Sequence, residues 1–425
     1  MELEKEIMAI AEWPRLSDDQ KIATATTVIS EFATGTVEPT VIALLAKQLA
    51  QSGEVWQWPE QWQSGDVVST GGGGSLTTLC CPYLLAGCGC YVPKLSVPGS
   101  FAGAIDTLEC LHGFRSQPDR AEMRQSLEVA HIAHSKNTNI LAPADGFLFA
   151  LRKKQGRTAV PTLAIASLLS KKLAVSCNTC AVDVRCGRYG NLGHDFETAA
   201  RNCELYVDVA RLLGLRVTCC ITDHSFPPMP LFGRLESIDA LNDLLNNAAV
   251  EPHLLSHFET CCVIAAHGLV AAKLATTVAE AYDIIMDRKA AGDAHQAFLS
   301  HLEHQGSSPA ALKEAIALLR SSPTYPVYPQ RDGILHNIDL RSLNVAIKTL
   351  NAVPPSASDR AGIRLLAAKG ERVEGGKPLA LLRIRKGDSV EPSDEVNKAL
   401  AAAFVIGDQC CVEHSYGIVQ AIRNH

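Results

Sequence analysis

Apolar residues recur at helical spacing over the first sixty positions of the chain. Ser17 and two acidic residues precede a stretch in which Val28 and Phe32 share one face, and a second apolar stripe runs over residues 38–52. Serine followed by acidic residues is typical of a helix start, and the glycine after each stretch is typical of a helix end. The pattern therefore predicts a helical segment over residues 1–64.

Short apolar runs alternate with helical stretches in the rest of the chain. The runs at residues 91–95, 182–185 and 215–223 are rich in β-branched or apolar side chains, and each is followed by a loop. Alternation of this kind predicts an α/β fold whose loops carry the functional site. The stretch 321–329 contains three prolines and is expected to be a connector. The predicted segments are 1–64 helical, 65–142 α/β, 143–175 helical, 176–330 α/β and 331–425 α+β.

A run of four glycines, within Ser69–Ser75, lies between a predicted strand and a predicted helix. Glycines let the backbone adopt conformations that point free N–H groups at an anion, and the flanking hydroxyls add further donors. A tight turn between two packed elements is the simpler interpretation of the glycines alone. No Gly-Lys-Ser/Thr follows them, so this is not a Walker A loop.

Composition excludes several classes of function. The 425 residues carry a net charge of −6 and a pI of about 6.2, which argues against a protein that binds nucleic acid or a membrane surface. We find no apolar run expected to span a bilayer, and the charged N-terminus is not typical of a signal peptide. The 15 cysteines indicate reduced thiols and a cytoplasmic protein. The motif Cys177–Cys180 is expected to be packing rather than a metal or redox site, and no metal or cofactor is predicted.

Two cations and a hydroxyl lie in the second helical segment. Ser167 and Lys171 are four residues apart and therefore share one helix face, and Arg152 lies upstream. Convergence of these groups would suit a polar ligand that carries carbonyl groups. From the spacing alone, however, we expect a solvated helix face with Lys171 and Lys172 in water.

Several short motifs, taken together, resemble one known family. They resemble those of the pyrimidine nucleoside phosphorylases, including thymidine phosphorylase, and more distantly those of the anthranilate phosphoribosyltransferases. The match runs over most of the chain. The motifs are specific when they are taken together, and any one of them alone would not be. The motifs are Ser69-Thr70-Gly71-Gly72, Leu141-Ala142-Pro143-Ala144-Asp145 with Leu151-Arg152, Ser167 with Lys171 in Ser-Leu-Leu-Ser-Lys-Lys, Asp183-Val184-Arg185 with Gly187, and Gly370-Glu371-Arg372-Val373.

The resemblance implies the arrangement of the segments. It implies a split all-helical domain packed against a large mixed-sheet α/β domain, with a C-terminal α+β subdomain. The active-site cleft is expected to lie between the domains and to close by a hinge motion. Members of the family are usually homodimers that contact through the helical domain, which is abbreviated here, so a homodimer is expected on weaker grounds.

The resemblance also implies the roles of the residues that bind the base. Arg152, Ser167 and Lys171 match the positions that hold the pyrimidine carbonyls and ring N–H. Nearby cations would stabilise the negative charge that develops on the departing base. Phe149 stands where the family has a tyrosine, and Lys153 stands where it has an aspartate.

The phosphate side departs further from the family pattern. Ser69, Thr78 and Ser96 match hydroxyl donors, and Gly71 and Gly72 match the phosphate loop. However, Val67 and Val68 replace the family's Lys-His, Ser75 replaces its aspartate, and Ala104 replaces a phosphate-binding threonine. Lys94 and Arg185 are the candidates for a replacement cation. The base half of the site is therefore expected to be intact, and the phosphate half to have lost its charge.

These departures leave three functions open. The first is phosphorolysis of a pyrimidine nucleoside to the free base and a (deoxy)ribose 1-phosphate. The second is hydrolysis with water as acceptor, for which His131, His134 and Asp106 are candidate general bases. The third is a non-catalytic relative that binds a pyrimidine. The expected partners are a pyrimidine nucleoside and either phosphate or water, with no nucleic acid and no membrane.

Overall fold

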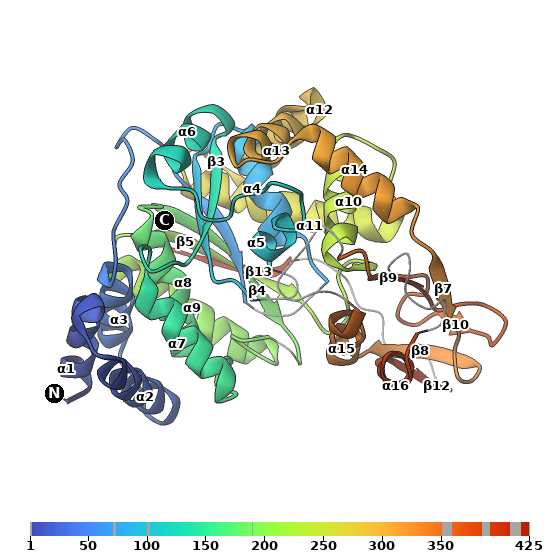
Figure 1. The fold of residues 1–425 in the computed structure, drawn as a ribbon, viewed down its shortest axis with the longest axis horizontal. Coiled ribbons are helices and arrows are strands. Elements are labelled where there is room, and N and C mark those ends of the chain that lie inside the picture. Colours follow the sequence, from blue (N-terminus) through green and yellow to red (C-terminus); the bar gives the residue numbers. More distant parts are fainter. Residues whose placement is uncertain are drawn as a thin grey trace.

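The computed structural model describes residues 2–70, 74–99, 103–188, 190–350, 359–384, 392–408 and 418–424. Its N-terminal part is helical, as predicted. The Ser17 hydroxyl accepts a hydrogen bond from the Gln20 N–H, and the Gln20 side chain accepts one from the Ser17 N–H, so a capping box starts the second helix. The helices of this unit, which Figure 1 shows at the left, pack on one another: α1 (Glu2–Ala9), a 3-10 helix (Ile10–Arg15), α2 (Asp18–Thr34), α3 (Pro39–Gln51), α7 (Pro143–Lys154) and α8 (Pro161–Ala174).

A mixed sheet forms the centre of the second unit. Strands β1 (Asp66–Ser69), β4 (Thr179–Cys186) and β5 (Arg216–Asp223) are parallel, and β13 (Ile418–Arg423) adds antiparallel to β5. A second parallel pair consists of β2 (Val92–Ser96) and β3 (Ile132–Lys136). The predicted strands are thus present, and the chain returns at its C-terminal end to complete the central sheet, which the sequence pattern did not indicate.

Helices cover the faces of this sheet (Figure 1). Helices α4 and α11 pack on each other and on β1 and β4, and α9 packs on β5. By length and composition α11 is one helix that could span a membrane, contrary to the expectation from the sequence, but 61% of its apolar window is buried inside the protein. The helices of this unit are α4 (Thr77–Gly87), α5 (Ala104–Leu108), α6 (Arg120–Ala130), α9 (Phe196–Leu212), α10 (Arg234–Leu245), α11 (Pro252–Ala271), α12 (Val278–Ala291), α13 (Asp293–His304) and α14 (Pro309–Arg320).

In its described residues, the C-terminal unit, at the right of Figure 1, contains two small sheets and two helices. The stretch 321–329 is not only a connector, because residues 324–327 form an edge strand; proline is tolerated at a sheet edge. The sheets have the orders β6-β9-β11-β7 and β10-β8-β12. The elements are β6 (Leu231–Phe232), β7 (Thr324–Val327), β8 (Gly333–Ile338), α15 (Leu340–Leu350), β9 (Gly362–Leu365), β10 (Arg372–Val373), β11 (Ala380–Arg383), α16 (Asp394–Ala403) and β12 (Phe404–Gly407).

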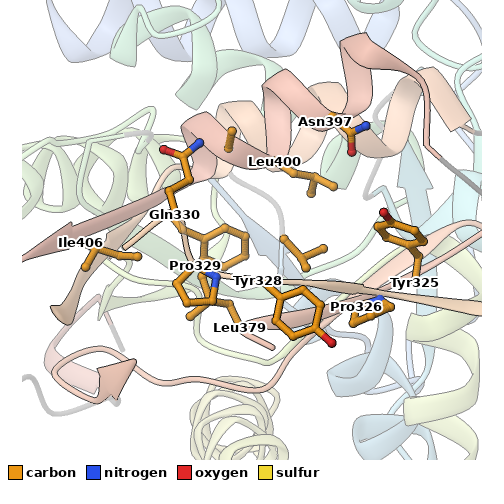
Figure 2. A pocket seen from close by; sticks show the side chains of 12 residues that line it. Tyr325, Pro326, Tyr328, Pro329, Gln330, Leu379, Asn397, Leu400 and Ile406 are labelled. Carbon is orange, nitrogen blue, oxygen red and sulfur yellow. The ribbon is translucent and has the colours of Figure 1, made fainter. Parts of the chain in front are cut away.

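A cavity of about 240 Å³ lies within this C-terminal unit (Figure 2). Tyr325, Tyr328 and Leu379 line one side, and Asn397 and Leu400 of α16 line another. None of the residues predicted for the substrate site contributes to its walls. The cavity therefore lies among β7 and the residues that follow it, α16 and β12, and not in the predicted cleft.

The chain crosses between the helical unit and the sheet unit at neighbouring places. The Glu54 N–H donates to the Ile140 carbonyl at 2.7 Å, and the Trp56 N–H donates to the Ala174 carbonyl at 2.9 Å. A Cβ at Gly53 would lie 2.1 Å from the Ile140 oxygen, so only glycine fits there. The crossing segments are therefore tied to one another where a hinge between the two units would lie.

Candidate active site

The predicted base-binding residues meet on α7 and α8. The Lys171 ammonium lies 2.7 Å from an Asp145 carboxylate oxygen and donates to the Ser167 hydroxyl at 2.9 Å and to the Ser167 carbonyl at 2.6 Å. The Lys171 side chain is only 7% exposed. Burial lowers the pKa of Lys171, and the neighbouring Asp145 carboxylate opposes that shift. The spacing argument for a solvated face was therefore wrong.

Lys172, the next residue, is also buried but points to a different carboxylate. It pairs with one oxygen of Asp66 in β1, and Lys94 of β2 pairs with the other oxygen at 2.8 Å. Burial alone would raise the pKa of Asp66, but the two ammonium groups outweigh it and the pKa is lowered. Adjacent lysines on one helix thus serve two separate ion-pair clusters.

Arg152 lies in the same helical unit and is 3% exposed. Its guanidinium donates to the carbonyls of Arg157, Thr158 and Leu163, at distances of 3.3, 2.9 and 3.3 Å. Burial lowers its pKa to about 10, while Asp145 acts in the opposite direction. Arginine has five N–H donors, so these three bonds hold the turn between α7 and α8 without using all of them.

Phe149 follows Asp145 by four residues, so both lie on one face of α7. The Phe149 side chain is half-buried. The structure thus brings Arg152, Ser167 and Lys171 together with Asp145, and it places Phe149 on the same helix. Asp145 is the member of this group to which the sequence analysis gave no role.

The stem of the glycine loop is fixed to β4. The Thr70 N–H donates to the Asp183 carbonyl at 3.1 Å, and the Thr70 hydroxyl accepts from the Arg185 N–H at 3.1 Å. The Thr77 hydroxyl, just after the loop, donates to an Asp183 carboxylate oxygen at 2.7 Å. Gly71 and Gly72 lie outside the described residues. Both ends of the loop therefore meet the carboxyl end of β4, where α/β proteins usually bind their ligands.

The three predicted hydroxyl donors come from three elements near this loop. Ser69 ends β1, Thr78 is partly exposed in the first turn of α4, and Ser96 ends β2. The Ser96 hydroxyl lies 2.7 Å from the Nε2 atom of His134 on β3. Burial and then the nearby Lys94 lower the pKa of His134 well below its ordinary value, so its ring is neutral.

The two candidate replacement cations are both buried in ion pairs. Lys94 binds Asp66 and donates to the Val67 carbonyl at 2.7 Å, so its ammonium lies beneath the stem of the loop. The Arg185 guanidinium binds Asp183 at 2.9 Å and the Thr77 hydroxyl at 3.1 Å. Arg185 therefore lies beside the loop, with its charge balanced by a carboxylate.

The candidate general bases lie in different surroundings. The His134 ring is engaged with Ser96, and the His131 ring stacks on Tyr91 with centroids 4.6 Å apart. An Asp106 carboxylate oxygen accepts from the Gly99 N–H at 2.8 Å. Of the three, His134 contacts the last residue of β2 and Asp106 contacts the loop that follows it, whereas His131 stacks on Tyr91, just before that strand.

Two polar side chains that the sequence analysis left without a role lie between the two halves. Asn137, after β3, donates to an Asp145 carboxylate oxygen at 3.3 Å. Lys153, at the end of α7, donates to the Gly99 carbonyl at 3.0 Å. The departure of Lys153 from the family's aspartate was visible in the sequence, whereas Asn137 gave no signal.

Comparisons with known proteins agree with this geometry. A family model described as the a/b domain of a glycosyl transferase family matches residues 62–192. Thymidine phosphorylases of Burkholderia orbicola (strain MC0-3) and Burkholderia cenocepacia (strain HI2424) are each 29% identical over 380 residues, covering 86% of this chain and 84% of theirs. The crystal structure of anthranilate phosphoribosyltransferase from Thermus thermophilus matches with a TM-score of 0.56 and 15% identity, covering 72% of this chain and 94% of that one. That structural likeness confirms the predicted fold class.

Proposed function

We propose that this chain, which is similar to thymidine phosphorylases and matches the a/b domain of a glycosyl transferase family, cleaves the N-glycosidic bond of a pyrimidine nucleoside by phosphorolysis. The products are the free base and a (deoxy)ribose 1-phosphate. Phosphate attacks C1′ of the sugar, the C1′–N bond breaks, and the electron pair of that bond leaves with the base.

The observation that carries this proposal is the cluster of Lys171, Ser167 and Asp145. An ammonium in a buried site acts more strongly on a developing anion than it does in water. Asp145 opposes the effect of burial and so favours the charged form of Lys171. The Ser167 hydroxyl, 2.9 Å from the ammonium, supplies a second polar contact for the pyrimidine.

We propose that the acceptor binds beside the glycine loop through neutral donors. The hydroxyls of Ser69, Thr78 and Ser96 are the described side-chain donors that we propose for it. Neutral hydrogen bonds to an anion are weaker than contacts with a cation. Phosphate is therefore expected to bind weakly, with a high KM.

Hydrolysis is the second candidate function, and one observation favours it. Val67 and Val68 are buried apolar residues where the related phosphate loop carries Lys-His. Water, unlike phosphate, needs no cation at that place. In this reaction the oxygen of water attacks C1′ and the water loses its second proton to solvent or to a general base.

The experiment measures base release from thymidine, uridine and deoxyuridine, with and without phosphate. Phosphorolysis predicts release that depends on phosphate and saturates with it. Equal release in phosphate-free buffer would overturn phosphorolysis in favour of hydrolysis. The matched variants are Lys171→Met, which is expected to lose most of the activity, and Lys154→Met, which changes an exposed lysine at the end of α7 and is expected to be active.

A further inference from the structure

Asn137 lies where the chain leaves the sheet unit for the helical unit. It directly follows β3, and α7 begins at Pro143. Its main-chain N–H donates to the Ser96 carbonyl at 2.8 Å. Its side-chain Nδ2 donates to the Ala142 carbonyl at 3.1 Å and to an Asp145 carboxylate oxygen at 3.3 Å. One residue therefore contacts both halves of the proposed cleft.

The two partners of Nδ2 fix which way the amide points. A carbonyl and a carboxylate are both acceptors, so the nitrogen of the amide must face them. The Oδ1 atom is buried and has no hydrogen-bond partner among the residues that the structure describes. A buried acceptor without a partner costs about 1–3 kcal/mol, and such atoms in a native protein require an explanation.

The backbone that Asn137 holds is itself strained. Ala142 has a φ of +46°, in the left-handed region that residues with a side chain rarely adopt. Its carbonyl also accepts from the Asp145 N–H at 3.1 Å, in the first turn of α7. The Asn137 amide therefore supports both the strained turn and the carboxylate that follows it.

We propose that Asn137 is a positioning residue that couples the base site to the acceptor site. Through Asp145 it orients Lys171 on the base side. Through Ser96 it holds the start of the acceptor loop. This inference rests on the proposed function, because it takes a pyrimidine and a phosphate as the two ligands.

Coupling has a thermodynamic meaning that can be measured. If binding of phosphate orders the segment that contains Asn137, thymine must bind more tightly when phosphate is present, and phosphate more tightly when thymine is present. The expected factor is about 5-fold or more, the lower end of typical coupling between sites. An amide that only stabilised the fold would leave this factor unchanged.

The test is calorimetric titration of thymine, with and without saturating phosphate, on the wild type and on Asn137→Ala. The wild type is expected to show the coupling factor, and Asn137→Ala is expected to reduce it to about 1 while thymine still binds. Asn137→Gln, which keeps the amide, is expected to restore part of it. Asn139→Ala changes an exposed neighbour and should retain the full factor.

Two results would overturn the inference: an unchanged factor in Asn137→Ala, or no coupling in the wild type. Thermal unfolding of each variant checks that the protein is folded. The proposed function has a separate readout, because phosphate-dependent base release by the wild type decides it whatever the coupling of Asn137→Ala. A phosphorolytic wild type whose Asn137→Ala variant keeps its coupling would contradict only the role of Asn137.

Discussion

The two halves of the proposed cleft differ in where their positive charge lies. On the base side, Lys171 forms an ion pair with Asp145. Arg152 donates to backbone carbonyls and feels the Asp145 carboxylate only through space. On the acceptor side, the hydroxyls are neutral, and the nearby cations Lys94 and Arg185 bind carboxylates inside the sheet. A cation thus lies beside the proposed site of the base, whereas the described cations nearest the proposed acceptor site bind carboxylates inside the sheet.

The cluster of Lys94, Asp66 and Lys172 qualifies this difference. Two ammonium groups on one carboxylate leave one surplus positive charge beneath the stem of the glycine loop. Each of these side chains is 4% exposed or less, so this charge acts on the acceptor only through space. The two halves therefore differ in which charged groups can touch a ligand, and four predictions break or sharpen this difference.

Lys171→Met should have the largest effect. Loss of the cation that we propose to stabilise the leaving base is expected to lower kcat/KM by about 10²–10³-fold or more, the usual cost of removing one such donor. Base release under saturating phosphate measures it. Because the variant leaves Asp145 buried without its partner, Lys171→Met with Asp145→Asn serves as the control for folding. Wild-type activity in a folded Lys171→Met protein would refute the assignment of the base site.

Asp66→Asn should affect stability and not the chemistry directly. It leaves two buried ammonium groups facing a neutral amide, which is expected to lower the free energy of unfolding by roughly 3–5 kcal/mol. Denaturant titration measures the loss. Lys94→Met leaves the Asp66–Lys172 pair intact and should cost less. If Lys94→Met instead raised the KM for phosphate as strongly as Lys171→Met lowers activity, Lys94 would be an acceptor cation and the comparison would fail.

Lowering the pH should reduce the free energy of unfolding through protonation of His134, which lies in the acceptor half. Burial lowers the pKa of His134 in the folded protein, so the unfolded chain binds the proton first as the pH falls below about 6.5. The stability that the neutral ring contributes is present above that pH and is lost below it, by up to roughly 1.4 kcal/mol per pH unit. Unfolding from pH 7 to 5 measures the slope, which should be shallower in His134→Gln. An identical slope in that variant would contradict a buried neutral His134.

Ser96→Ala should have the smallest effect. It removes one neutral donor from the acceptor side, worth about 1 kcal/mol, and should raise the KM for phosphate about 5-fold without changing the KM for the nucleoside. Steady-state kinetics with each substrate varied in turn separates the two constants. An increase of a hundredfold or more would mean that the hydroxyl, and not the loop N–H groups, dominates acceptor binding.

Patterns within short stretches of sequence predicted much of the fold. The strands around Val67 and Val182 are apolar runs between turn residues, and the capping box at Ser17 is local, so each is visible without knowledge of the tertiary structure. Strand β7 was missed because Pro326 indicates a connector unless the strand is known to lie at an edge. The pairing of β13 with β5 joins distant segments, and no local pattern encodes it.

The candidate site was predictable only in part. Helical spacing places Ser167 and Lys171 on one face, but it cannot show that Asp145 and Asp66 lie at the ends of Lys171 and Lys172. Both carboxylates are distant in sequence from the lysines they pair with. A lysine can be buried only when such a partner is present, so the helical spacing alone could not predict the burial. Asn137 belongs to no periodic sequence pattern, and the role that we propose for it follows only from the contacts of its side-chain amide in the structure.

The most direct test of the account is the identity of the sugar product. In ³¹P NMR of the wild-type protein with thymidine and phosphate, we predict loss of inorganic phosphate and growth of a deoxyribose 1-phosphate resonance in step with free thymine. Thymine released with free deoxyribose and unchanged phosphate would contradict phosphorolysis, and with it the proposal that the uncharged donors of the acceptor half bind phosphate.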